Sequence, residues 1–453
     1  MRILLLLLLS CSMSLGATYY VRTDGNNSNA GTTDSAGGAW LTVQKAANTA
    51  VAGDTVIVKN GTFPEVVATA AHGTSGSPIN FMGSGATKIY SFGIDHVFNN
   101  VSNFWVVPGG SAYAGIRYTT NNVRIERNYL DNLIFIPIRM IDSAGSFPVP
   151  ANWPTNVYIG GNTITNCTNS AKSIDFCGNS SIVESNWITS NMQDAFNVLG
   201  SSNDFRYNVA TNILWDSVTA DPNHNDWIQI EDPNIGSTPF TDWHCSHNTF
   251  HHNLVINSIT ALVQFQVNSA TNRYHHLNLV SNTFVRLTFN ASPGIPNCNW
   301  QHNVFYRVAT SNGFAAPLTY YAGDSQFRSA PGTNRNNAFV ACGYQTNAGV
   351  GYTFGWTNSA AGNSTDYNFL ADHPEKSYGA LAGYGAGLNN VNGGNPLWVD
   401  IDNGNSHLQL GSPFIGEAEG GGDIGPYPYE SGAVSTYVNA AISLGIPNSK
   451  SDF

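Results

Sequence analysis

Glu184-Ser185-Asn186-Trp187-Ile188 is one copy of the short motif that decides the fold of this chain. The motif places an asparagine after a short strand-like pair and before an aromatic or β-branched run. Its other copies have their asparagine at Asn128, Asn162, Asn208, Asn248, Asn282, Asn303, Asn337 and Asn368. The shortest spacings, 21 to 24 residues, leave room for about three short strands with tight turns. Such a unit is the rung of a parallel β-helix.

An asparagine at one rung position can stack on its copies above and below and satisfy turn amides, often in the left-handed αL conformation. We therefore expect an asparagine column that belongs to the scaffold and carries no chemistry.

The composition is that of a large, turn-rich globular protein. Of 453 residues, 42% are hydrophobic and only 10% are charged, and 45 are glycine, which excludes a disordered chain and a coiled coil. Helical periodicity is confined to residues 41–50 and 434–444. We predict an all-β, right-handed parallel β-helix over residues 18–430, with an N-terminal capping helix and a C-terminal helical tail or cap over 431–453.

Residues 1–17 are typical of a secretory signal peptide. Arg2 precedes an apolar run, and small residues lead to Gly16 and Ala17. The neighbourhood of Cys11 also fits a lipoprotein processing site, at which that cysteine would be acylated. No later stretch approaches the ~20 apolar residues of a membrane span. We expect a monomeric extracellular or periplasmic protein, either soluble or tethered through Cys11.

Five cysteines follow Cys11, an odd number with no CxxC spacing. They are Cys167, Cys177, Cys245, Cys298 and Cys342. We expect buried, unpaired thiols, although Cys167 and Cys177 are close enough in sequence to pair.

The chain is acidic, with 18 Lys and Arg against 29 Asp and Glu. Its net charge of −11 becomes −12 when Arg2 leaves with the signal peptide. This charge disfavours a nucleic-acid partner. An anionic polysaccharide would need a local cluster of the scarce cations or a bound metal ion.

Segments at both ends resemble a known superfamily. Tyr19-Tyr20-Val21, Gly53-Asp54-Thr55-Val56 and Gly61-Thr62-Phe63 look like the opening of secreted right-handed β-helix proteins of the pectate-lyase-like superfamily. Residues 395–400 and 407–413 look like its closing rungs. The resemblance implies the fold and a carbohydrate-active protein. The superfamily includes polysaccharide lyases, glycoside hydrolases, uronan epimerases and non-enzymatic surface proteins, so the activity stays open.

Aligning the strands by their inward apolar pairs predicts two columns of polar side chains. Outward residues at equivalent rung positions lie about 4.8 Å apart. The first column comprises Arg139, Asp175, Asn197, Gln229 and Gln266. The second, at the strand starts, comprises Lys172, Asp194 and Asp226. Solubility and a surface salt bridge are the alternatives to function here.

The longest gap in the asparagine spacing, between Asn208 and Asn248, falls beside these columns. It carries Trp215, His224 and Trp227, and loops that interrupt a solenoid are often its binding loops. Flat aromatic rings beside hydrogen-bonding groups suit sugars, although tryptophans also cap core ends. Asp221-Pro222-Asn223-His224 departs from the Asp-Pro-His signature of uronan epimerases by the inserted Asn223.

The favoured activity is a lyase that cleaves a uronate-containing polysaccharide by β-elimination. Lys172 or His224 is the candidate base, and Asp226 completes the catalytic set. The substrate carboxylate is neutralised by Arg139 or by Ca²⁺ bound to Asp175, Asp194 and Asp226. Asn197, Gln229, Gln266, Trp215 and Trp227 are the candidate substrate-binding residues.

Two other functions fit the same residues. A glycoside hydrolase would use a pair from Asp175, Asp194 and Asp226 as acid and as base or nucleophile. A non-enzymatic glycan-binding surface protein would use only the tryptophan-rich loop. We do not expect the adjacent histidines His251-His252 and His275-His276 to bind a metal ion, because neighbouring side chains on an extended strand diverge.

Overall fold

The computed structural model describes most of the chain. Its described residues are 16–110, 114–141, 150–167, 172–190, 194–213, 226–231, 244–257, 261–266, 274–289, 299–310, 319–320, 333–340, 355–356, 364–366, 369–371, 391–392, 395–427 and 429. Residues 1–15 of the predicted signal peptide (1–17) and the predicted C-terminal helix lie outside these residues. Among the helices of the described residues, none is long and apolar enough to cross a membrane.

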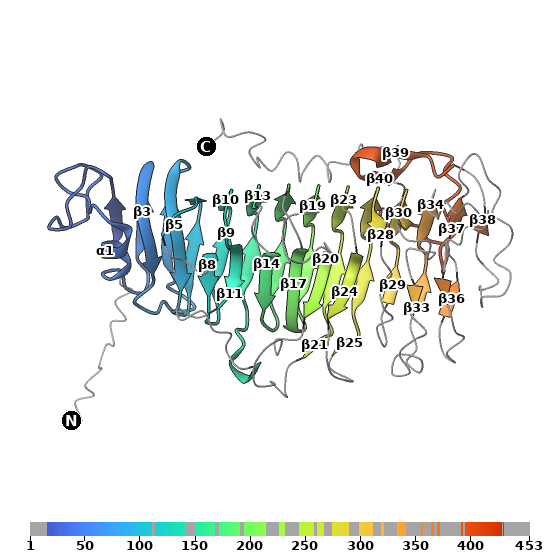
Figure 1. Cartoon of the computed structure of the whole chain (residues 1–453), viewed down its shortest axis with the longest axis horizontal. Helices are drawn as coiled ribbons and strands as arrows, with labels where there is room; N and C mark the ends of the chain where they lie inside the picture. Colours follow the sequence, from blue (N-terminus) through green and yellow to red (C-terminus); the bar gives the residue numbers. More distant parts are fainter. Residues whose placement is uncertain are drawn as a thin grey trace, which may run out of the picture.

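The chain winds into an elongated solenoid of parallel strands (Figure 1). One wall is a 13-stranded parallel sheet, which we call the first ladder. Its strands in order are β1 (Thr18–Val21), β2 (Thr55–Val58), β4 (Ile79–Gly83), β6 (Asn99–Ser102), β9 (Arg124–Glu126), β12 (Tyr158–Gly160), β15 (Ile182–Glu184), β18 (Asp204–Arg206), β22 (Thr249–His251), β26 (Asn278–Val280), β29 (Asn299–Gln301), β33 (Thr333–Arg335) and β36 (Ser364–Asp366).

The other walls form one 21-stranded sheet in which the long strand β5 pairs with both β7 and β8. The second ladder is β3 (Gly61–Ala68), β5 (Thr87–Ile94), β7 (Trp105–Val106), β10 (Tyr129–Asp131), β13 (Thr163–Thr165), β16 (Trp187–Thr189), β19 (Val209–Thr211), β23 (Leu254–Ile256), β27 (Thr283–Val285), β30 (Val304–Tyr306), β34 (Ala338–Val340), β37 (Phe369–Ala371) and β38 (Val391–Asn392). The third ladder continues from β5 through β8 (Ala114–Tyr118), β11 (Ile136–Met140), β14 (Lys172–Cys177), β17 (Asp194–Ser201), β20 (Asp226–Glu231) and β24 (Ala261–Gln266).

Short strands complete the described elements. They are β21 (Cys245–Ser246) and β25 (Tyr274–His275) beyond the end of β17, the pair β28 (Thr288–Phe289) and β31 (Ala309–Thr310), and the pair β32 (Thr319–Tyr320) and β35 (Gly355–Trp356). The predicted parallel β-helix is confirmed, with apolar side chains from all three ladders in one core.

The predicted asparagine column lies at the turn between the first and second ladders. Asn186 is 1% exposed, and its Oδ1 accepts hydrogen bonds from the backbone N (3.1 Å) and the Nδ2 (3.0 Å) of Asn162. Its own Nδ2 donates to the carbonyl of Ile159 and to Oδ1 of Asn208. Each side chain therefore ties three successive rungs together.

Two details of the predicted column are wrong. The αL residue is the one before the asparagine, as at Ser185 and Tyr207, which have φ of 55° and 54°. Asn253, rather than Asn248, continues the column by accepting from the N and Nδ2 of Asn208. Asn248 instead pairs with Asn203 at the turn between the third and first ladders. Both turns are held by the same hydrogen bonds between stacked asparagines, so the local motif does not distinguish them. Asn368 lies outside the described residues.

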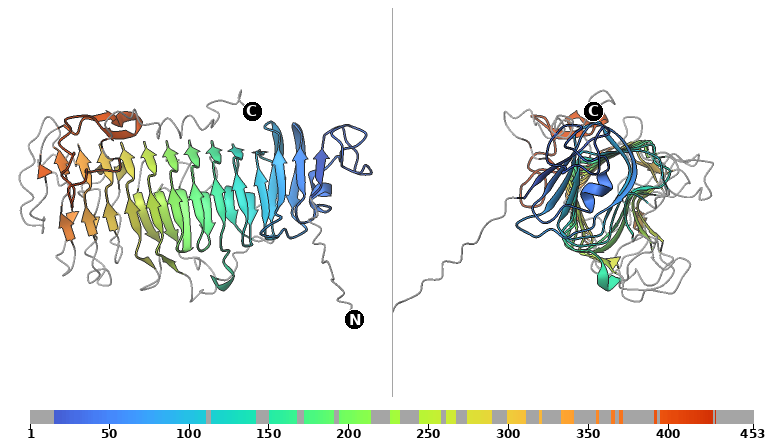
Figure 2. Two further views of the ribbon diagram at one scale, coloured as in Figure 1. Left: turned by 180° about the vertical axis from the view of Figure 1, so that it is seen from behind. Right: turned by 90° about the vertical axis from the view of Figure 1, so that its left-hand side faces the viewer.

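The predicted N-terminal cap is confirmed as helix α1 (Val43–Ala47), which lies across the end of the solenoid (Figure 2, right). Thr42 caps its first turn by accepting from the N–H of Lys45 at 3.2 Å. The carboxylate of Glu65 on β3 accepts from the N–H groups of Val43 and Gln44, both at 2.9 Å. Val43, Ala46 and Ala47 are buried and close the apolar core against water.

Residues 395–400 and 407–413, which were expected to form closing rungs, do not join the long parallel sheets. Strands β39 (Trp398–Asp400) and β40 (Asn405–Leu408) pair antiparallel and belong to neither long sheet. They lie outside the solenoid beside the second ladder (Figure 1), where Trp398 and Phe414 bury the outward side chains of Val304, Ala338 and Val340. A separate small apolar cluster therefore covers the last rungs. The two 3-10 turns are Pro150–Asn152 and Ile401–Asn403.

Three cysteines behave as expected. Cys167, Cys177 and Cys245 are buried thiols. Burial raises the pKa of Cys167 and of Cys245 to about 12, so neither thiol is reactive in the folded protein. Cys298 and Cys342 lie outside the described residues.

Replacing one asparagine of the column tests its structural role. Asn186→Ala leaves the N and Nδ2 of Asn162 without their shared buried acceptor. We expect this variant to lose about 1 to 3 kcal/mol in free energy of unfolding, measured by urea denaturation. Asn299→Ala, which removes a half-buried amide pair with Asn278 on the outer face, is the control. An equal loss in both variants would contradict the role of the column.

Candidate functional site

A column of polar residues runs across the third ladder as the sequence predicts. Arg139 on β11 is the Cα partner of Asp175 on β14, Asp175 of Asn197 on β17, and Asn197 of Gln229 on β20. The residues on either side of Asp175, Ile174 and Phe176, belong to the core. Because side chains alternate along a strand, the column faces away from the core. We call these residues and their in-register neighbours the polar column.

Asp175 is the centre of this column. It is 0% exposed, and its Oδ2 accepts from Nε of Arg139 at 2.9 Å while its Oδ1 accepts from Nδ2 of Asn197 at 2.8 Å. The Arg139 side chain keeps 22% of its surface exposed. A buried carboxylate must be paired and hydrogen-bonded, and both conditions are met here. The result is a fixed guanidinium at a partly open position.

Asn197 carries an unused acceptor. Its Oδ1 is buried and, among the residues that the structure describes, has no hydrogen-bond partner. Buried polar atoms without a partner are rare in folded proteins. This atom lies next to the Arg139–Asp175 pair, so it is a candidate acceptor for a sugar hydroxyl.

The prediction that Gln266 is the last member of the polar column is wrong. Gln229 pairs with Gln264, and Gln266 lies opposite Glu231. The predicted alignment was therefore shifted by two residues on β24. Because side-chain direction repeats every two residues, this shift keeps the face and moves the position along the strand. Both glutamines follow an apolar residue, so the local pattern does not separate them.

The structure adds Arg117, which sequence reasoning missed. Arg117 on β8 is the Cα partner of Arg139, and it forms a two-pronged ion pair with Asp95. Its guanidinium lies over Gly93, where an added Cβ would come within 2.5 Å of Nη2. Ile116-Arg117-Tyr118 shows the same apolar–Arg–apolar pattern as Ile138-Arg139-Met140, and that pattern could have predicted it. Two arginines on neighbouring rungs thus extend the polar column.

The second predicted column also lies in register. Lys172 is the Cα partner of Asp194, and the backbone N–H of Asp226 donates to Oδ1 of Asp194 at 2.9 Å. Asp194 and Asp226 are 2% and 0% exposed, whereas Lys172 is half-buried. Ala195 and Phe196 both belong to the core, so the in/out alternation is interrupted near these strand starts. Two buried carboxylates and a lysine therefore come from three adjacent strands.

Trp227 cannot stack on a sugar as predicted. It is 1% exposed, and its ring packs edge-on against Phe250 and Phe284, with centroids 5.8 and 5.3 Å apart. Because the in/out alternation of side chains is interrupted at the start of this strand, the side chain of Trp227 points into the core. Trp215 and His224 lie outside the described residues, and so does most of the loop that carries them.

The described residues do not by themselves form the predicted calcium site. No three His, Cys, Asp or Glu side chains among them are grouped to bind a metal ion. Both oxygens of Asp175 accept protein hydrogen bonds, and Oδ1 of Asp194 accepts from Asp226. The positive charges available in this part of the molecule are those of Arg117, Arg139 and Lys172.

No protein-family model and no curated protein sequence matches this chain. Solved structures match it in fold. The crystal structure of pectate lyase Pel9A covers 92% of this chain and 98% of its own, with a TM-score of 0.55 and 11% identity. A GH136 lacto-N-biosidase from Eubacterium ramulus (77% and 67% covered, TM-score 0.46, 11% identity) and an alginate lyase from Paenibacillus sp. (72% and 95%, 0.40, 12%) are also similar. At such identity the likeness shows the fold alone, a parallel β-helix.

Substituting Asp175 tests the ion pair of the polar column. Asp175→Asn leaves Arg139 without its carboxylate, so we expect a loss of about 2 to 4 kcal/mol in free energy of unfolding. The control is Asp402→Asn, because Asp402 pairs with Arg286 on the surface and is 51% exposed. That variant should change stability by less than about 1 kcal/mol in the same urea titration. The pairing would be unimportant if Asp175→Asn unfolded like the wild type.

Proposed function

We propose that this protein is a polysaccharide lyase that cleaves a uronate-containing glycan by β-elimination at the third ladder. The observation that carries the proposal is the gathering of cations on three neighbouring strands. Arg117, Arg139 and Lys172 come from β8, β11 and β14 in a chain with only 18 Lys and Arg. Arg117 and Arg139 are each paired with a carboxylate, Asp95 and Asp175, so the cluster offers fixed donors for a substrate carboxylate rather than a net positive charge.

The proposed reaction uses Lys172 as the base. Its neutral amine takes the proton from the carbon next to the uronate carboxylate, and the electron pair moves into the carboxylate as an enediolate. The guanidinium of Arg139 stabilises this developing charge. The electrons then form the carbon–carbon double bond as the glycosidic bond breaks, and the leaving oxygen takes a proton from the protonated lysine or from water.

The neighbouring polar groups support these roles. Asp175 fixes Arg139 through a 2.9 Å hydrogen bond, and preorganised groups stabilise a transition state better than mobile ones. Asn197 and Gln229 continue the column by one rung each, and both are 2% exposed, so they support the column from within. His224 is the alternative base, and Asp226, beside Asp194, completes the catalytic set. No step is assigned to Ca²⁺, because among the described residues no three acidic or histidine side chains are grouped to bind a metal ion.

A glycoside hydrolase is the second candidate. The observation that favours it is the buried pair Asp194 and Asp226, which lie on adjacent rungs and are linked by a backbone hydrogen bond. One of the two carboxyls would serve as general acid and the other as base or nucleophile.

The test measures absorbance near the unsaturated-uronate band on a panel of acidic and neutral polysaccharides, with Ca²⁺ or with chelator, beside a reducing-end assay. We expect rising absorbance on an acidic substrate. Lys172→Ala and Arg139→Ala should each lower kcat by about 10²-fold or more, because they remove the base and the charge stabilisation. Lys88→Ala is the matched control, since Lys88 lies over the Trp105 ring on the second ladder.

Each other outcome changes the proposal. Reducing ends without absorbance would replace the lyase by the hydrolase. Loss of activity with chelator would restore the calcium site of the sequence prediction. Binding without turnover on every substrate would favour a glycan-binding surface protein. An unchanged kcat in Lys172→Ala would move the base to His224.

A further inference from the structure

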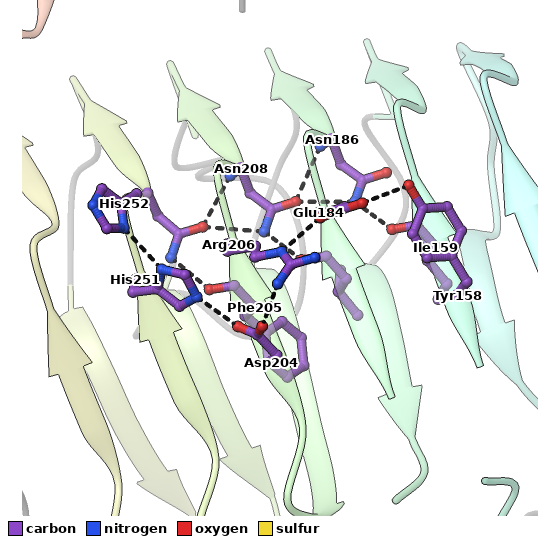
Figure 3. Close-up of polar contacts among 12 residues, drawn as sticks. Tyr158, Ile159, Glu184, Asn186, Asp204, Phe205, Arg206, Asn208, His251 and His252 are labelled. Atoms are coloured by element: carbon purple, nitrogen blue, oxygen red, sulfur yellow. Dashed lines mark hydrogen bonds and ion pairs between the residues drawn. The ribbon is translucent and has the colours of Figure 1, made fainter. Parts of the chain in front are cut away.

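His251 and His252 lie on the first ladder, a different wall of the solenoid from the polar column. His251 is the last residue of β22, and His252 follows it in the turn before Asn253. Figure 3 shows the two rings with Asp204, Arg206 and Glu184 from the two preceding rungs. This group takes no part in the proposed lyase reaction.

The two imidazoles converge, contrary to the sequence prediction. Their Nδ1 atoms are 2.8 Å apart and share one hydrogen bond, in which one ring donates and the other accepts, and the rings meet at 80°. The prediction assumed an extended strand, along which successive side chains point to opposite faces. His252 instead has φ of 54°, in the left-handed region, so the backbone turns at this residue. That turn brings its ring back beside the ring of His251.

Asp204 fixes the orientation of His251. Its Oδ1 lies 2.9 Å from Nε2 of His251, which is the distance of an ion pair if that ring is protonated. The other oxygen of Asp204 accepts from Nη1 of Arg206 at 2.9 Å, and Nε of Arg206 donates to Glu184 at 2.6 Å. In metal sites, a ligating histidine usually has a carboxylate beside its second ring nitrogen, the position that Asp204 occupies beside His251.

The pair is reachable from solvent, because the His251 side chain keeps 22% of its surface exposed. A metal ion bound between the rings would replace the hydrogen bond that joins the two Nδ1 atoms, and the proton of that bond would move to Nε2 of the same ring or to solvent.

We propose that His251 and His252 bind a divalent transition-metal ion of the Zn²⁺ and Cu²⁺ class through their two Nδ1 atoms, with Asp204 as the outer partner of His251. Imidazole nitrogen suits these metals, whereas Ca²⁺ prefers oxygen. At a Zn–N distance of about 2.0 Å, the two nitrogens must open to about 3.3 Å, a small rotation of each ring. Among the described residues no third ligand completes the site, so solvent fills the remaining positions.

The test is a titration of chelator-treated full-length protein with Zn²⁺, followed by calorimetry. We expect one saturable site. Asp204→Asn should weaken binding by about 10-fold to 100-fold, as loss of an outer partner does. His252→Gln and His251→Gln should abolish it. The matched control is His247→Gln, because exposed His247 and His276 stack in parallel at 4.8 Å and 6° and cannot direct both lone pairs at one ion.

A second measurement keeps the proposal falsifiable if a variant fails to fold. The electron paramagnetic resonance spectrum of the wild-type protein with one equivalent of Cu²⁺ should show coupling to two imidazole nitrogens. One nitrogen or none would overturn the site, and so would wild-type affinity in folded His252→Gln. Polysaccharide turnover should be unchanged in His252→Gln, so failure of this proposal is distinguishable from failure of the proposed lyase.

Discussion

The hydrogen bonds between stacked asparagine side chains are the constraint on which the rest of the structure depends. In the column through Asn186, each amide accepts from the backbone and side chain of one neighbour and donates to the next, at a depth where water is excluded. An unmatched buried amide is costly, so each rung must place its turn at the same position as the rung before. This fixes the rise and phase of the solenoid at every turn, and loops of very different length can leave from the other corners.

Because each rung starts at the same position as the rung before, residues that are far apart in the sequence lie side by side and form sites. Arg117, Arg139, Asp175 and Asn197 are separated by 22 to 36 residues in sequence, yet they become neighbours because their strands are in register. The same stacking on another wall aligns Glu184, Arg206 and His251 into a continuous polar chain (Figure 3). One scaffold therefore carries two chemically different clusters. The first has guanidinium, amine and carboxylate groups, and the second ends in two converging imidazoles.

Sequence reasoning succeeded where a local pattern has one structural meaning. The β-helix, the capping helix, the start of the polar column and the Lys172–Asp194 neighbours all followed from a repeated turn motif and from strict alternation. It failed where two positions share a pattern. Gln264 and Gln266 both follow an apolar residue, and Asn248 and Asn253 both open a strand after a turn. Trp227 was misplaced because alternation is interrupted beside it, which no local signal reveals.

By itself the sequence determined the repeating unit, because an asparagine, a turn and a short apolar run recur often enough to specify a rung. It also determined the acidity of the chain and the scarcity of its cations. Only the tertiary structure decided which rung lies beside which, since pairing partners are set by the length of every intervening loop. It likewise decided that His251 and His252 converge, because one positive φ at His252 reverses the direction that an extended strand would give.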